Sequence, residues 1–182
     1  MSVVADFYRG FRRTGNYNNE KTFDEWMLAT DREWAECHCL IQWLFPLVYR
    51  SPNAPDAYLD LDNLEAMKTG PMQAKLRRAF MRFCEFLHFN IHNLNFEDYT
   101  QIAFSEKSIS RVLASTRLLG LEAKGLLLLK GLLQDPYTSD HPSMRHWKDA
   151  GLGPEWSFAS NDLCLREISK RKQQHVIVIQ DD

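Results

Sequence analysis

The chain has 182 residues, a length that suits one domain or one domain with an appendage. Apolar residues make up 45% of it and charged residues 25%, as in ordinary globular proteins, which excludes a chain that is disordered throughout. The formal net charge of −2 disfavours a protein that is basic over its whole surface, but it is compatible with a local basic face.

The beginning of the chain carries neither a basic segment nor a long apolar run, so we expect no secretory signal. The longest leucine-rich run, Leu126–Leu133, is far shorter than the ~20 residues that span a bilayer. We therefore expect a soluble protein of the cytoplasm, or of the nucleus in a eukaryote, without a membrane partner. In these compartments free thiols are expected for all four cysteines, Cys37, Cys39, Cys84 and Cys164.

The first clear helix signal follows an irregular lead-in over residues 6–20. Thr22-Phe-Asp-Glu25 fits a capping box, in which the threonine and the glutamate each satisfy a backbone N–H of the first turn. Apolar residues then recur at partly helical spacing. We expect one helix from Thr22 to about residues 40–44, because Pro46 cannot continue it.

Two helices are predicted in the middle of the chain. The acidic stretch after Pro55 favours a short helix over residues 60–69 that ends at Gly70, and Pro71 fits the first position of the next one. In that second helix, residues at three- and four-residue steps form one apolar stripe: Leu76, Ala79, Phe80, Phe83, Cys84 and Leu87.

Two further helices and a looser tail are predicted after residue 100. Ser105 or Ser108 is expected to cap a helix that Gly120 closes. The segment Glu122–Gln134 is apolar nearly all round, so we expect it at the centre of the core. Residues 135–182 are expected to pack on the domain of residues 1–134 or to trail from it, with a short helix to about Lys170 and a β-branched segment at 176–179. The predicted fold class is all-α: a compact multi-helix single domain with an irregular C-terminal extension.

No catalytic or metal-binding pattern in the sequence is complete. Cys37 and Cys39 are two apart, and on a helix they would point in different directions, which disfavours a shared zinc ion. Glu85, His88 and His92 would share one face of a helix, but a di-metal bundle needs a second such motif. The glycine pair at 120 and 125 lacks the lysine of a phosphate loop. We predict no cofactor and no metal, and we lean against an enzyme.

A basic face is the remaining candidate for chemistry. Lys75, Arg78 and Arg82 lie on one side of the predicted helix that begins at Pro71, and Arg111 is expected nearby. Such faces bind phosphate groups in nucleic-acid-binding proteins, although they are more often ordinary solvated helix surface.

The most specific motif is apolar except for its histidine, cysteine and glutamine, and it reads His38-Cys-Leu-Ile41-Gln42-Trp43-Leu44-Phe45-Pro46. It resembles the His-x-x-Ile-Gln-Trp-Leu-Phe-Pro signature of the opioid growth factor receptor conserved region. Further segments in the same order are similar to that family: Asp6–Gly10, Trp26, Asn53, Leu76–Phe89 and Ser110–Glu122. The resemblance covers roughly residues 6–134. It departs from the family at Ala35, where a glutamate is usual, and near Phe104 and Ser105, where a His-Asn pair is missing.

The resemblance implies a non-enzymatic regulator, since the vertebrate receptor of that family is nuclear-associated and binds an enkephalin peptide. The sequence hypothesis is therefore a helical binding or regulatory module, with a peptide or protein as partner. The alternatives are a nucleic-acid or phosphate-ligand binder that uses the basic face, and a metal-dependent enzyme. The candidate ligand-binding residues are His38, Gln42, Lys75, Arg78, Arg82 and Arg111.

Overall fold

Helices make up most of the structure, a computed structural model that describes residues 3–16 and 19–152. The N-terminal helices are α1 (Val3–Arg9), α2 (Phe23–Leu28), α3 (Asp31–Glu36), α4 (Leu40–Leu44) and α5 (Leu61–Met67). They are followed by α6 (Gly70–Phe86), the strands β1 (Phe89–Asn90) and β2 (Asn95–Phe96), α7 (Ile102–Leu118), α8 (Glu122–Gln134), α9 (Pro136–Ser139) and α10 (Met144–Leu152). The all-α fold class is confirmed. The helix expected near Lys170 and the segment at 176–179 lie outside the described residues.

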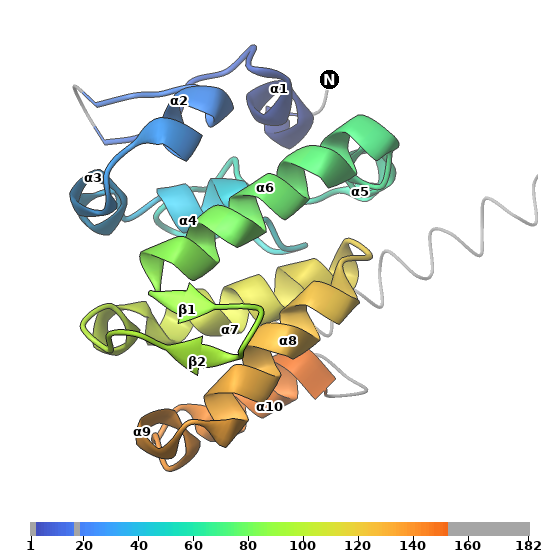
Figure 1. The fold of residues 1–182 in the computed structure, drawn as a ribbon. Helices are drawn as coiled ribbons and strands as arrows, with labels where there is room; N and C mark the ends of the chain where they lie inside the picture. The colour runs from blue at the N-terminus through green and yellow to red at the C-terminus, as the bar shows by residue number, and fades with distance from the viewer. Residues whose placement is uncertain (1–2, 17–18, 153–182) are drawn as a thin grey trace, which may run out of the picture.

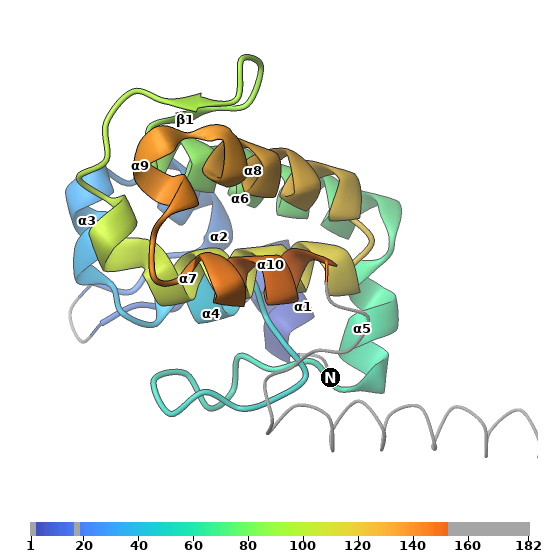
Figure 2. The same ribbon diagram turned by 90° about the horizontal axis from the view of Figure 1, so that it is seen from below.

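The helices are arranged on the two sides of α6. Helices α1 to α3 lie on one side of it, and α7 to α10 lie on the other (Figures 1 and 2). The strands β1 and β2 form an antiparallel hairpin, with Phe89 opposite Phe96, beside the end of α6. Helices α9 and α10 pack against α8 and α7, and Trp147 of α10 is completely buried. Among the described residues, no helix is both long and apolar enough to cross a membrane.

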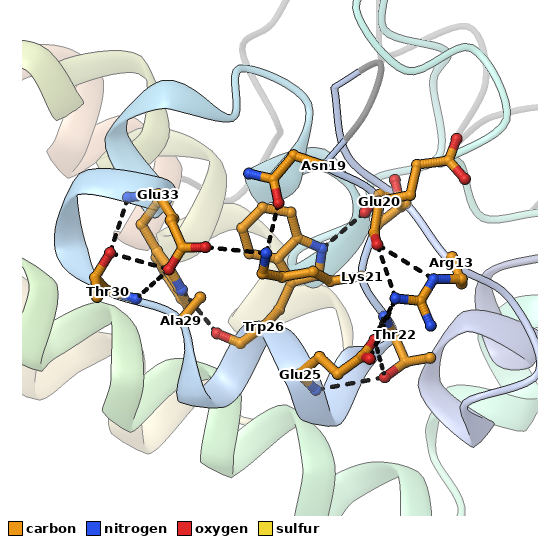
Figure 3. Close-up of polar contacts among 12 residues, drawn as sticks. Arg13, Asn19, Glu20, Lys21, Thr22, Glu25, Trp26, Ala29, Thr30 and Glu33 are labelled. Carbon is orange, nitrogen blue, oxygen red and sulfur yellow. Dashed lines mark hydrogen bonds and ion pairs between the residues drawn. The ribbon is translucent and has the colours of Figure 1, made fainter.

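The single helix expected over residues 22–44 is wrong, because the chain forms three short helices there. Ala29 ends α2 in an extended conformation, and Cys37 ends α3. The Thr22–Glu25 capping box is confirmed, and a second one follows at Thr30 and Glu33 (Figure 3). In the second box the Thr30 N–H donates to the Glu33 carboxylate at 2.9 Å, and Thr30 Oγ1 accepts from the Glu33 N–H at 3.3 Å. A capping box marks the start of a helix, so α3 begins at the second box as a helix separate from α2.

The predicted stripe of α6 is buried along its whole length, and Pro71 lies in the first turn as expected. The start of α7 is different from the prediction, because the helix begins at Ile102, before either serine. Gly120 closes α7 with a positive φ of 79°, a conformation that suits glycine.

The central helix of the core is α7 and not α8. Every residue from 109 to 116 is buried, because α4, α8 and α10 all pack against α7. Helix α8 has the predicted bounds, but Leu126 is 37% exposed and Lys130 faces solvent. Two glycines allow α8 to approach its neighbours closely. A Cβ atom at Gly125 would lie 2.4 Å from the Thr116 hydroxyl, and one at Gly131 would lie 2.3 Å from the Phe89 ring.

The end of α4 is held by side chains that are distant in sequence. Pro46 ends the apolar run, so the preceding carbonyl groups have no partner within a helix. Tyr8 of α1 donates its hydroxyl to the Leu44 carbonyl at 2.5 Å. From α7, Arg111 donates to the Phe45 carbonyl at 3.3 Å and Ser115 to the Pro46 carbonyl at 3.0 Å. The run therefore joins α1 to α7 through three consecutive carbonyl groups.

Trp43 of the same run is 5% exposed, and its ring centroid lies 5.6 Å from that of Phe7. We expect Trp43→Ala to lower the free energy of unfolding by about 3–5 kcal/mol, because it removes a buried aromatic side chain and leaves a cavity. Urea unfolding of the full chain measures this. Phe11→Ala is the control, since Phe11 is 81% exposed and its loss should change stability by about 0.5 kcal/mol or less. Equal effects of the two substitutions would contradict the prediction.

The second capping box makes stability depend on pH. The N–H of Thr30, followed by the ammonium group of Lys21, lowers the pKa of Glu33 from 4.5 to about 2. A carboxyl group with a lowered folded-state pKa stabilises the fold above its unfolded pKa and loses that contribution as the pH falls. We therefore expect the stability that Glu33 provides to be complete above pH 4.5 and to disappear as the pH approaches 2.

Urea unfolding at neutral pH, at pH 4.5 and at pH 3 tests this expectation. Glu33→Gln should flatten the decrease in stability with falling pH, because glutamine does not titrate. Glu85→Gln, at an exposed position of α6, is the control and should retain the slope of the unsubstituted protein. The same slope for Glu33→Gln and the unsubstituted chain would show that Glu33 does not contribute.

Candidate functional site

A cleft of about 640 Å³ lies where α4, the loop after it, and the starts of α7 and α10 meet. Ile41 and Gln42 come from α4, and Tyr49 and Asn53 come from the loop. Most of its polar lining is uncharged and able to donate or accept hydrogen bonds: Gln42, Ser51, Asn53, Ser108, Ser110 and Ser143. Its charged lining residues are Glu106, Lys107 and Arg111. Clefts of this size and mixed lining are typical of ligand sites.

Arg111 is the most unusual residue of this cleft. Its side chain is buried, with 8% of the residue exposed, and its guanidinium group lies 5.3 Å from the centre of the Tyr49 ring. Burial lowers the pKa of Arg111, and Tyr49 opposes that shift. A guanidinium group has five N–H donors, but among the described residues only the hydrogen bond to the Phe45 carbonyl is present. No carboxylate forms an ion pair with Arg111 in this part of the chain.

Glu106, the acidic residue of the same cleft, is already engaged by α10 and the segment before it. Ser143 donates its hydroxyl to the Glu106 carboxylate at 2.7 Å, and His141 Nε2 lies 3.4 Å from the other carboxylate oxygen. The Trp147 indole donates to the Glu106 carbonyl at 3.0 Å. These contacts hold Glu106 toward α10, so they leave Arg111 without a neutralising partner on its side of the cleft.

A second cleft, of about 540 Å³, adjoins the first. It is lined by residues of α3 and α4, including Trp34, by His38 in the turn between these helices, and by Phe86 and Gln101. The two clefts share Ile41, Gln42 and Ser108. We refer to these two adjoining clefts together as the α4 groove.

Gln42 lies at the junction of the two parts of the α4 groove. In the orientation that satisfies its amide, the side-chain nitrogen donates to the His38 carbonyl at 3.1 Å and to the Cys39 carbonyl at 3.0 Å. Its own amide therefore holds the turn before α4. Of the candidate residues in the sequence, Gln42 lines both clefts, Arg111 lines the first, and the exposed residue His38 lines the second.

The basic face of α6 lies against α2 and α3 and not at the groove. Lys75 and Arg78 both pair with Asp24, at 3.1 and 2.6 Å, and Lys75 also lies over the Phe23 ring. Arg82 pairs with Asp31 at 2.6 Å, donates to the Ala29 carbonyl at 2.9 Å and lies over the Trp34 ring. These contacts attach α2 and α3 to α6, and they offset charge that a phosphate ligand would otherwise meet.

The histidine pattern at 85–92 does not form the helical face that the spacing suggested. Helix α6 ends at Phe86, so only Glu85 is helical. His88 has a positive φ of 53° just after the helix, and His92 lies in the turn between β1 and β2. Among the described residues, no three His, Cys, Asp or Glu side chains form a group that could hold a metal ion.

Several residues of the groove were missed by sequence reasoning, including Ser51, Glu106 and Ser143. Each lies in a segment without strong periodicity or a motif, so the sequence contains no signal that brings them together. Asn53 was noted for the family resemblance alone, and it does line the cleft. No family model, curated protein or solved structure matches this chain.

The contacts of Arg82 predict a structural role. We expect Arg82→Ala to lower the free energy of unfolding by about 1–3 kcal/mol, because it removes charge-assisted hydrogen bonds to Ala29 and Asp31. Arg77→Ala is the matched control, since Arg77 is an exposed arginine of the same helix and its loss should change stability by about 0.5 kcal/mol or less. Urea unfolding of both variants provides the comparison, and a small effect at both positions would exclude Arg82 as an anchor.

Proposed function

We propose that this protein is a non-enzymatic helical binding module whose α4 groove holds a peptide segment that carries a carboxylate. The single observation that carries the proposal is the buried guanidinium group of Arg111, which lines the groove without an ion-pair partner among the described residues. A buried charge is costly unless an opposite charge and hydrogen bonds compensate it. A ligand carboxylate would provide both, because it matches the planar donors of arginine in a bidentate pair.

The form of the groove favours a chain over a compact small molecule. Its two parts have volumes of about 640 and 540 Å³ and adjoin at Ile41, Gln42 and Ser108. An extended segment fits such a path, with its carboxylate at Arg111 and its backbone amides near the serine hydroxyls and the Asn53 amide. Trp34, Phe86 and Ile41 supply apolar surface for side chains. The resemblance to a peptide-binding regulator also supports this partner class.

Among the residues that the structure describes, no unpaired buried charge or comparable observation supports the other two hypotheses, a nucleic-acid or phosphate-ligand binder and a metal-dependent enzyme. The contacts of Lys75, Arg78 and Arg82 with Asp24 and Asp31 explain those cations within the fold. No specific observation favours nucleic-acid binding or metal-dependent catalysis over a binding module.

Peptide selection tests the proposal for a ligand whose sequence is unidentified. Short random peptides with free carboxyl termini are displayed and selected on the full chain at low salt. We expect the selected peptides to be enriched in Asp and Glu or to depend on the terminal carboxyl group. Arg111→Gln should weaken their binding by about 10- to 100-fold, the equivalent of a lost charged hydrogen bond. Fluorescence anisotropy with a labelled selected peptide measures the affinity.

Two controls separate binding from folding. Arg145→Gln removes an exposed arginine of α10 that lines neither part of the groove, and it should leave the affinity unchanged. Glutamine keeps an amide donor for the Phe45 carbonyl, and thermal unfolding of Arg111→Gln without peptide reports any change in folding that the substitution causes. Unchanged affinity in a folded Arg111→Gln variant would refute the proposal. So would a selection that shows neither acidic preference nor dependence on the terminal carboxyl group.

A further inference from the structure

The turn between α3 and α4 brings two cysteines together. Cys37 directly follows α3 and Cys39 directly precedes α4, and the Leu40 N–H donates to the Cys37 carbonyl at 3.2 Å to close the turn. On a continuous helix the two side chains would diverge, but here their Sγ atoms lie 3.6 Å apart. The sequence expectation that these thiols point apart is wrong because the helix is interrupted between them.

The two thiols of this pair are in different environments. Cys37 is 3% exposed, whereas Cys39 is partly exposed. The two Sγ atoms are within hydrogen-bonding distance of each other, and the Thr14 hydroxyl lies 4.0 Å from Cys39 Sγ. The thiol of Cys37 lowers the pKa of Cys39, and the same contact together with burial raises the pKa of Cys37. The nucleophilic thiolate of the pair is therefore the accessible one.

We propose that Cys37 and Cys39 are an oxidisable dithiol that low-molecular-weight disulfides convert into an intramolecular disulfide. The Cys39 thiolate attacks one sulfur of the oxidant, forms a mixed disulfide and releases one thiolate of the oxidant. Cys37 then loses its proton and attacks Cys39 Sγ, which releases the second thiolate. Two electrons pass from the cysteine pair to the oxidant, and the two thiol protons end on its two reduced halves.

The geometry requires little movement for this closure. A disulfide bond is about 2.05 Å long, so the sulfur atoms need to approach by about 1.5 Å from their 3.6 Å separation. Gln42 donates to the carbonyl groups of His38 and Cys39, so it holds the turn in the conformation that brings the thiols together. Cys84 provides an internal comparison, because it is 1% exposed on α6 and burial raises its pKa to about 12.

The test uses the full chain equilibrated with mixtures of oxidised and reduced glutathione. After acid quenching and alkylation of free thiols, trypsin releases Cys37 and Cys39 together on residues 33–50, Cys84 on 83–107 and Cys164 on 149–166. We expect the 33–50 peptide to lack two alkyl groups and to be lighter by two hydrogens than the dithiol form. Cys84 should remain fully alkylated.

A synthetic peptide of residues 33–50 is the matched control for the fold. The full chain should form the disulfide at a ratio of oxidised to reduced glutathione at least tenfold lower than the free peptide requires. Cys37→Ser should stop after the first step and accumulate glutathione on Cys39. Cys39→Ser should leave Cys37 largely reduced.

Three results would overturn the proposal. The first is a full chain that needs the same ratio as the free peptide, because the fold would then contribute nothing. The second is glutathione that stays on Cys39 although Cys37 is present. The third is a disulfide from Cys39 to Cys164 or Cys84 in place of the bond to Cys37.

Discussion

Three buried carbonyl groups at the end of α4 need hydrogen-bond donors, and other parts of the structure supply them. Pro46 ends the helix inside the core, so the carbonyls of residues 44–46 are buried without helical partners. A buried polar group without a partner costs about 1–3 kcal/mol. Tyr8 and two side chains of α7 supply the missing donors, and their positions place α1 and α7 on either side of α4. The apolar run therefore contributes its side chains to the core, and its backbone carbonyl groups connect α1 to α7 through hydrogen bonds.

One of these donors, Arg111, also brings a positive charge to the α4 groove. Arg111 reaches the Phe45 carbonyl from the most buried stretch of α7, and a neutral donor would satisfy that carbonyl equally well. An arginine brings a full charge and further N–H donors into a site where Glu106 is held by Ser143 and His141. Arg111 lines a cleft whose other polar groups are mainly hydroxyl and amide groups. Folding and the proposed binding thus depend on the same side chain, so the two effects of its substitution need separate measurements.

Regular helices with one apolar face were predictable from the sequence. The stripe of α6 and the bounds of α8 follow from the 3.6-residue period and from Gly70, Pro71 and Pro136. The breaks in the segment 22–44 were missed, although Thr30-Asp-Arg-Glu33 carries the same capping signal as Thr22-Phe-Asp-Glu25. Apolar residues on both sides of that signal suggested a continuous helix. A separate break lies between α3 and α4, and it turns Cys37 and Cys39 toward each other. The continuous helix expected over residues 22–44 therefore concealed the thiol pair.

The sequence by itself determined the all-α class, the amphipathic faces of the long helices and the candidate residues of the central run, because these depend on neighbours within a few residues. Only the tertiary structure decided what those residues meet. It placed Lys75, Arg78 and Arg82 against Asp24 and Asp31, and it left Arg111 beside an open cleft without a carboxylate among the described residues. The four basic residues look alike in the sequence. Their electrostatic roles differ because the role of a charged side chain depends on the groups that contact it. These groups lie more than forty positions away along the chain.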